Sequence, residues 1–247
     1  MQAALYTAAC IKQNRLKKVD MTSTRFPLDV QNLKPRSELI ADAIRTSILS
    51  GYFRPGDKLD QQEIADELAV SHIPVREALR TLFAEGMITI IPNKGAMVTE
   101  RTLEEVSELY FIRGLLEGAA AERAVEQIDD SDIEKMESIL NVAEQTNELE
   151  RLLVLNNDFH MTLYRAGGQP EMVDLIQRLR NKVAPYNRMY MDVDLARNKA
   201  AAWEEHRRIY DACRAKDPRL AKTETEKHLD RVLQCIVLEM ENLNGSK

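Results

Sequence analysis

The chain has 247 residues, of which 44% are hydrophobic and 30% charged, as expected for a globular protein of one or two domains. Its net charge of −6 excludes a protein that binds nucleic acid through overall positive charge. Residues 1–100 hold 13 basic and 12 acidic side chains, whereas residues 101–247 hold 21 and 28, so only the N-terminal part is expected to approach a phosphate backbone.

Cysteine usage and apolar runs indicate the compartment. Cys10, Cys213 and Cys235 are far apart and form no Cys-x-x-Cys motif, which favours a reducing cytoplasm. No apolar stretch approaches the roughly 20 residues that a membrane span needs, so no membrane partner is expected. Residues 1–20 do not resemble a signal peptide, because their basic residues follow the apolar part, and Met21 is a reasonable start. Residues 1–34 are expected to form an arm that is partly disordered.

After this arm, the pattern predicts two helices before residue 70. The first spans 36–50 and turns an apolar set inward, namely Leu39, Ile40, Ala43, Ile44 and Ile48. The run from Gly51 to Gly56 ends it. Asp60 as N-cap and Glu63 three residues later can form a capping box, which starts a short second helix.

A third helix is predicted from Ser71, and it has two distinct faces. Val75, Ala78, Leu79 and Leu82 form its apolar stripe, while His72, Arg76 and Arg80 recur every four residues on another face. Only a tight turn fits between the second and third helices, so the pair reads as a helix-turn-helix. A cationic face opposite a buried one suits a DNA major groove.

A β-hairpin is predicted directly after this helix. Gly86 suits the left-handed position that ends a helix. Residues 87–91 and 96–99 are β-prone, and Pro92–Gly95 make the turn between them. The hairpin is therefore a candidate wing, with Lys94 in its turn as a candidate phosphate contact.

The run from Ile44 to Val98 resembles the GntR family of bacterial transcription regulators. The resemblance rests on Gly51, Arg54–Leu59, Ile64–Ala65, Val70–Ser71, Pro74–Leu79, Glu85–Gly86 and Gly95–Val98. It implies a winged helix-turn-helix that binds palindromic operators as a homodimer. The DNA-contacting positions of the family carry over to Ser71, His72, Ile73, Pro74, Arg76 and Gly95 of this chain.

Two departures from the family pattern bear on base recognition. His72 stands where many members have Arg, and Ile73 stands where Thr or another small residue is common. A neutral imidazole reads guanine less well than the guanidinium fork does, so the operator is expected to differ at that base. Arg80 is added to the candidate contacts because it continues the cationic row. The alternative is that Arg76 and Arg80 form surface pairs with Glu77 and Glu85.

From about residue 103 the chain changes to long helical stripes with few Pro and Gly. Helices are predicted over 103–127, 130–146, 149–166, 170–190 (bent by Pro185), 196–216 and 218–243. The expected fold is therefore mainly α. A winged helix-turn-helix occupies 35–100, and an all-α antiparallel bundle occupies 101–247.

Three of the four histidines interrupt apolar seams on three different helices. His160 shares its seam with Asn156, and His206 and His228 lie on the two later helices. Converging buried imidazoles with no strong acid nearby are costly unless a metal holds them. The pattern predicts a divalent metal site, with zinc, nickel or a similar ion as cofactor. The alternative is that each is a satisfied core histidine.

These histidines also lie in a part of the chain that resembles a known domain. Asn156–His160, Glu205–Arg208 and His228–Leu229 are similar to the FCD effector domain of FadR-like GntR regulators. The resemblance implies a metal held by Asn156, His160, His206 and His228. Asn156 replaces the acid that many members have, which removes a negative charge from the site.

A half-coordinated cation facing a cavity attracts a small organic acid. Arg113 interrupts the seam formed by Val106, Leu109, Leu116 and Ala120, and is a candidate effector-binding residue. The alternative for Arg113 is a local pair with Glu117.

The expected function is a ligand-responsive regulator and not an enzyme. A metal-dependent hydrolase with a DNA-binding-like domain and a constitutive architectural DNA binder are the alternatives.

Overall fold

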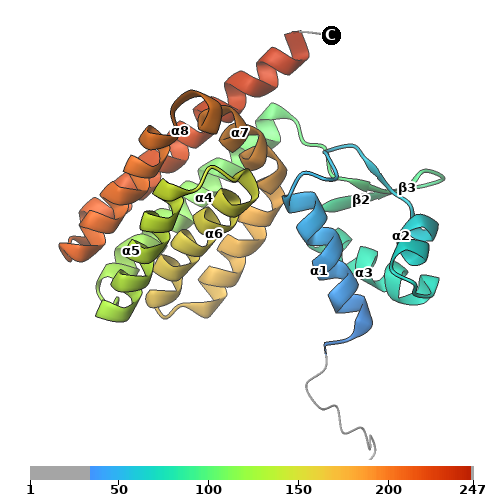
Figure 1. The fold of residues 1–247 in the computed structure, drawn as a ribbon, viewed down its shortest axis with the longest axis horizontal. Helices are drawn as coiled ribbons and strands as arrows, with labels where there is room; N and C mark the ends of the chain where they lie inside the picture. Colours follow the sequence, from blue (N-terminus) through green and yellow to red (C-terminus); the bar gives the residue numbers. More distant parts are fainter. Residues whose placement is uncertain (1–33, 246–247) are drawn as a thin grey trace, which may run out of the picture. The chain divides into compact units, whose positions relative to one another are not determined.

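The computed structural model describes residues 34–245, and for residues 189–190, 192–202 and 243–245 only the backbone is described. The expected N-terminal arm lies outside these residues apart from Lys34. The described chain forms a winged helix-turn-helix followed by a helical bundle (Figure 1). Among the described residues, no helix combines the length and the apolar character needed to span a membrane.

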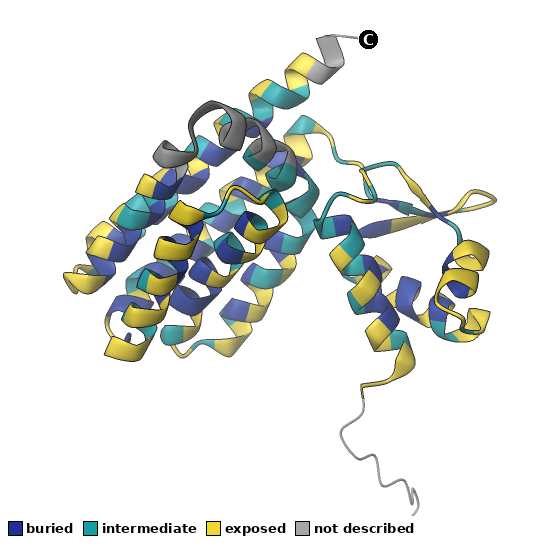
Figure 2. Ribbon diagram, in the orientation of Figure 1, coloured by how far each residue is buried: buried dark blue, intermediate teal, exposed yellow. Residues whose placement is uncertain are grey.

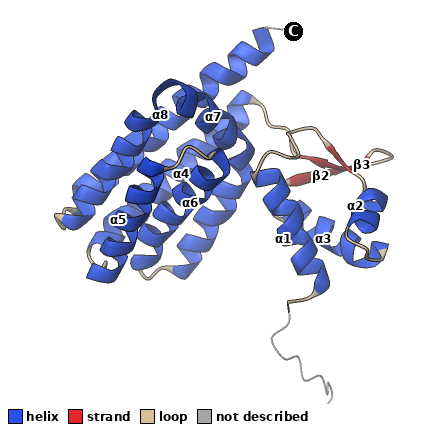
Figure 3. Ribbon diagram, viewed as in Figure 1, coloured by secondary structure: helices blue, strands red, loops and turns tan. Residues whose placement is uncertain are grey.

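The N-terminal body contains three helices and a small sheet (Figure 3). The helices are α1 (Arg36–Leu49), α2 (Gln61–Glu67) and α3 (His72–Ala84). The strands are β1 (Lys58–Leu59), β2 (Ile88–Ile91) and β3 (Gly95–Val98), in the antiparallel order β1-β3-β2. Ile88 pairs with Val98 and Ile91 with Gly95, which gives the predicted hairpin. The two-residue strand β1 is too short to leave a pattern in the sequence.

The core of this body follows the apolar periodicity of its helices (Figure 2). α1 buries Ile40, Ala41, Ile44 and Ile48. The expectations for Leu39 and Ala43 were wrong: both are exposed, Leu39 by 53%, because Ile40, Ile44 and Ile48 at four-residue spacing define the inward face. Asp60 caps α2 as predicted, by accepting from the backbone N–H groups of Gln62 and Glu63, but among the described residues Glu63 does not complete the expected capping box.

The C-terminal body is a bundle of five helices among the residues described (Figure 1). They are α4 (Leu103–Val125), α5 (Asp130–Gln145), α6 (Leu149–Ala166), α7 (Pro170–Arg214) and α8 (Pro218–Gly245). Thr102 and Glu105 form a capping box at the start of α4. The largest core cluster joins residues of all five helices, among them Phe159 and Trp203.

One predicted break is absent. Separate helices were expected over 170–190 and 196–216, but α7 is continuous from Pro170 to Arg214, with Pro185 inside it. Residues 191–195 contain neither Gly nor Pro, so the local sequence does not stop the helix. In a straight helix, Arg180 and His206 would lie about 39 Å apart. Arg180 and His206 instead belong to two polar clusters that contact each other, as described below. Residues 170–188 and 203–214 are therefore two arms of α7.

Candidate functional site

α3 presents the candidate DNA-reading side chains. Its buried face consists of Val75, Ala78, Leu79 and Leu82, which belong to the core of the N-terminal body. His72, Ile73, Arg76 and Arg80 are exposed, and Ile73 is 60% exposed. Ser71 occupies the N-cap position, although its hydroxyl makes no capping hydrogen bond. The packing therefore directs an apolar and cationic surface away from the core.

The arginines of α3 are available for a ligand. Both carboxylate oxygens of Glu85 accept from Arg45, at 3.0 and 2.7 Å, so Glu85 is not the partner expected for Arg80. Among the described residues, no ion pair is recorded for Arg76 or Arg80. The surface-pair alternative thus loses its main support.

The hairpin turn places its residues at the end of the wing. Asn93 and Gly95 have positive φ values of 64° and 90°, and Lys94 between them is exposed. Gly86 has a φ of 71°, as predicted for the end of α3. An exposed Lys at a tight turn suits contact with a phosphate.

Three imidazoles converge inside the bundle, one each from α6, α7 and α8. His160, His206 and His228, here called the histidine cluster, are 1%, 3% and 4% exposed. Their ring centroids are separated by 4.6–5.2 Å, and one ligand atom from each lies within 4.8 Å of the others. The apolar seams of the sequence thus identified three histidines that lie together in the structure.

Hydrogen bonds orient two of these rings. Tyr164 donates its hydroxyl proton to Oε2 of Glu117 at 2.7 Å, so its oxygen accepts from Nδ1 of His160 at 3.2 Å. Nδ1 of His228 donates to Oε2 of Glu205 at 2.8 Å. With the proton on Nδ1, each ring keeps the lone pair of Nε2 for a ligand. A carboxylate behind a metal-binding His is a usual outer-shell arrangement.

Electrostatics favour the neutral form of His160 and His228, as a metal ligand requires. Burial and the charge of Arg180 hold the pKa of His160 well below its usual value. Burial also lowers the pKa of His228, although Glu205 opposes this shift. The donor set fits a divalent cation: nitrogen ligands of tetrahedral zinc lie about 3.3 Å apart, so the ligand atoms, now within 4.8 Å of one another, would need to approach by at most about 1.5 Å.

The sequence analysis found no strong acid near the histidines, and this was wrong. Glu205, 12% exposed, contacts His228 and also pairs with Arg231. Its partner lies 23 residues away on another helix, so no local pattern reveals the contact. Glu117 is the second acid near the cluster, through Tyr164.

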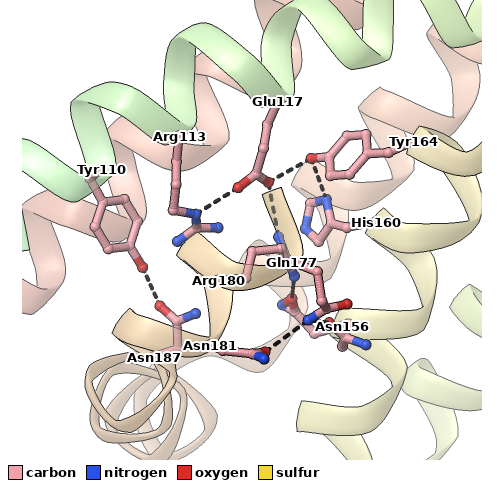
Figure 4. A network of polar contacts seen from close by, with 11 residues as sticks. Tyr110, Arg113, Glu117, Asn156, His160, Tyr164, Gln177, Arg180, Asn181 and Asn187 are labelled. Carbon is pink, nitrogen blue, oxygen red and sulfur yellow. Dashed lines mark hydrogen bonds and ion pairs between the residues drawn. The ribbon is translucent and has the colours of Figure 1, made fainter. Parts of the chain in front are cut away.

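Asn156, the fourth ligand implied by the resemblance, contacts Arg180. Its Oδ1 lies 3.4 Å from Nη2 of Arg180, and it is half-buried (Figure 4). Arg180 was missed by the sequence analysis, although it interrupts the buried seam of Val173, Ile176 and Val183 just as Arg113 interrupts its own.

Arg113 forms the local pair that was considered as its alternative. Its Nε donates to Oε1 of Glu117 at 2.6 Å, and its guanidinium lies 4.5 Å from the centre of the Tyr110 ring. Nη1 of Arg180 donates to Oε2 of the same carboxylate at 2.9 Å (Figure 4). Arg113, Glu117 and Arg180 are here called the arginine–glutamate cluster.

Comparison with known proteins identifies the family. The family model described as "Bacterial regulatory proteins, gntR family" matches residues 36–98. The family model of the FCD domain matches residues 108–231, which is half of the chain. The chain belongs to the GntR family. It is a bacterial transcription regulator with a GntR helix-turn-helix domain and an FCD domain, which confirms the resemblance and the mainly α fold. FCD domains are commonly metal-binding.

Curated relatives of this GntR-family protein are regulators and not enzymes. It is 26% identical over 191 residues to the HTH-type regulator YdhC of Bacillus subtilis, covering 76% of this chain and 84% of the relative. It is 27% identical to the Nta operon transcriptional regulator of Aminobacter aminovorans, with coverages of 76% and 90%. It is 26% identical to the transcriptional repressor RspR of Escherichia coli, with coverages of 82% and 90%. The hydrolase alternative is therefore dropped.

Solved structures show the same fold. Escherichia coli McbR/YncC matches with a TM-score of 0.76 at 21% identity, covering 84% of this chain and all of that one. A GntR regulator from Rhodococcus sp. RHA1 matches with a TM-score of 0.71 at 24% identity, with coverages of 81% and 97%.

Proposed function

We propose that this GntR-family regulator binds a palindromic operator as a homodimer, and that a small carboxylate bound at a divalent metal changes its DNA affinity. The observation that carries the proposal is the convergence of three buried imidazoles in the FCD domain, away from the sequence that contains the helix-turn-helix. One part of the chain would read DNA and another would sense a metabolite. Action on DNA also favours the cytoplasm.

The proposed DNA contacts have complementary chemistry. They are Ser71, His72, Ile73, Pro74, Arg76, Arg80, Lys94 and Gly95. Arg76 offers a bidentate guanine contact, and the exposed side chain of Ile73 suits the methyl group of thymine. Lys94 would contact a phosphate, and the wing glycine allows close backbone approach.

A homodimer would place two recognition helices in successive major grooves, roughly 34 Å apart. Phe111 and Leu115 lie one turn apart on α4 and are 68% and 58% exposed, which supports a contact between two copies. Sedimentation of the full chain and of the Leu115→Glu variant tests this point. A monomeric wild-type protein contradicts the homodimer.

The proposed metal ligands are His160, His206 and His228. A bound divalent ion supplies a Lewis-acidic position for a carboxylate oxygen. The protein contributes the orientation: Glu205 and Tyr164 hold the Nδ1 protons of two rings, and all three rings are buried. Asn156 stays a candidate fourth ligand, because its amide oxygen has two lone pairs and Arg180 uses one.

Metal binding is tested by metal content and by fluorescence. Trp203, the only tryptophan, stacks on His206 with ring centroids 4.6 Å apart, so Ni²⁺ or Co²⁺ is expected to quench its emission. His160→Ala should lose the metal and the quenching. His72→Ala is the matched control, because His72 is the fourth histidine and lies exposed on α3. Stoichiometric metal in the His160→Ala variant contradicts the site.

Operator binding is tested separately, by selection from random duplexes at moderate ionic strength with and without metal. A palindrome should emerge, and organic acids should change the affinity for it. A palindrome whose affinity responds to neither metal nor acid would instead support the constitutive architectural binder. No sequence preference at all contradicts the proposed function.

A further inference from the structure

The arginine–glutamate cluster has more positive than negative charge. Glu117 is fully buried and receives hydrogen bonds from Arg113, Arg180 and Tyr164, at 2.6, 2.9 and 2.7 Å (Figure 4). The two arginines are 2% and 6% exposed. One carboxylate balances one guanidinium, so the cluster carries a net charge of +1. Burying such a charge is costly unless a counter-charge arrives.

The arginine–glutamate cluster also contains unsatisfied hydrogen-bond donors in the described structure. Nη1 of Arg113 and Nε of Arg180 are buried and have no hydrogen-bond partner among the residues that the structure describes. A guanidinium carries five N–H donors and accepts nothing, so these atoms can be satisfied only by an acceptor. Unsatisfied buried donors beside an excess positive charge indicate an anionic ligand.

Arg180 is the member of the cluster that a ligand can reach. Together with Asn156, Asn157, Gln177 and Asn181 it lines a cavity that residues 46–50 at the end of α1 also border. The other four side chains end in neutral amides, so Arg180 supplies the charge of this group. The one carboxylate in the described lining, Glu150, pairs with Arg188 at 3.1 Å and does not balance Arg180.

The same cluster touches the histidine cluster through a single hydroxyl. Tyr164 contacts both Glu117 and His160. A divalent ion on three neutral imidazoles would add two positive charges close to Arg180. Asn156, which contacts Arg180, offers a carboxamide and therefore no negative charge. A ligand with one negative charge would leave one of the two cationic centres without compensation.

We propose that Arg180 binds a second anionic group, so that the effector of this protein is an organic acid with at least two negative charges. One group would lie at the histidine cluster and the other against Arg180 and Asn156. Arg113 is a positioning residue, because it engages Glu117 and so prevents that carboxylate from neutralising Arg180. This inference rests on the proposed function, since it assumes the metal-dependent carboxylate site.

The ligand test uses the full-length, zinc-loaded protein and matched pairs of acids. Malonate, succinate, glutarate, malate and citrate are each compared with a monoamide of the same skeleton by thermal shift and titration calorimetry. The diacid or triacid that binds should do so at least about tenfold more tightly than its monoamide, because a charge-assisted hydrogen bond is lost. Equal binding of a diacid and its monoamide overturns the inference, and so does the absence of binding by every acid.

The variants change charge at one position. Asn156→Asp adds a negative charge beside Arg180 and should reduce the preference for the diacid by about tenfold. Asn141→Asp makes the same change at an exposed position of α5 and should leave the preference unchanged. Because the Asn156→Asp change is at a half-buried polar position, it should preserve the fold.

Arg180→Met tests the anchor directly, since Glu117 keeps Arg113 as its partner. It should lose the diacid preference while retaining zinc, and Arg180→Lys should restore part of the preference. An unchanged preference in Arg180→Met overturns the inference even if operator binding and metal content are normal. Loss of operator binding or of metal in the wild-type protein instead contradicts the proposed function, because both are measured without any acid.

Discussion

Removing the carboxylate of Glu117 should destabilise the bundle severely. In the variant Glu117→Leu, two guanidiniums that are 2% and 6% exposed lose the only carboxylate that pairs with them in the described part of the chain. Breaking a buried ion pair from one side costs about 3–5 kcal/mol, because the remaining charge stays buried and uncompensated. For a domain of this size the unfolding temperature should fall by roughly 6–20 °C, taking about 2–4 °C for each kcal/mol.

Urea denaturation followed by Trp203 fluorescence measures this effect in the bundle alone. Trp203 is the only tryptophan and is 5% exposed within the largest core cluster, so its emission does not report on the helix-turn-helix domain. Circular dichroism at low urea checks that the variant still folds. The measured quantity is the free energy of unfolding of the FCD domain.

The triple variant Arg113→Met, Glu117→Leu, Arg180→Met provides the control. It removes all three charges together and should recover most of the lost free energy, because well-packed apolar replacements of buried ion pairs are often neutral or stabilising. A Glu117→Leu variant within about 1 kcal/mol of the wild type would refute the reasoning. So would a triple variant less stable than Glu117→Leu, since the cost would then come from packing and not from uncompensated charge.

Four further predictions concern pH, DNA contact, helix capping and thiol reactivity. Burial alone would raise the pKa of Glu117. The charges of Arg113 and Arg180 outweigh this effect and hold that pKa below its usual range. The stabilisation should therefore be full above the unfolded pKa of about 4.3 and be lost as pH falls through the lower folded value, and acid titration of Glu117→Leu should lack this component. Arg76→Ala should weaken operator binding by about 1–3 kcal/mol and relax one base position, whereas an equal loss on random duplexes would mean a phosphate contact. Asp60→Ala should cost about 0.5–2 kcal/mol of stability in the helix-turn-helix domain, measured by circular dichroism of thermal unfolding, with Gln62→Ala as a near-neutral comparison. Burial raises the pKa of the Cys213 thiol to about 12, so iodoacetamide at pH 8 should modify it only after unfolding, as peptide mass spectrometry would detect.

The sequence predicted well what periodicity and spacing determine. The apolar stripe of α3, the left-handed Gly86 and the hairpin turn are local features, and each is present. The three histidines were also found from the sequence, because each interrupts an apolar seam and so must point inward.

Contacts between helices distant in sequence were harder to predict. Glu205 and His228 lie 23 residues apart, and Arg180 and Glu117 lie 63 apart, so nothing local pairs them. Asn156 was assigned to the metal because it shares a face with His160, and the contact of its oxygen with Arg180 from α7 was not foreseen. Arg180 was itself detectable, since it breaks a buried seam as Arg113 does.

The rings of His160 and His228 are fixed by the polypeptide itself, through Tyr164 and Glu205. The bundle around them also has a core of buried side chains from five helices, unlike a zinc finger, which has no fold until it is loaded. A chelator should thus empty the centre and leave the bundle standing. The ion could then exchange with the solution and act as a signal, because the fold would not depend on it.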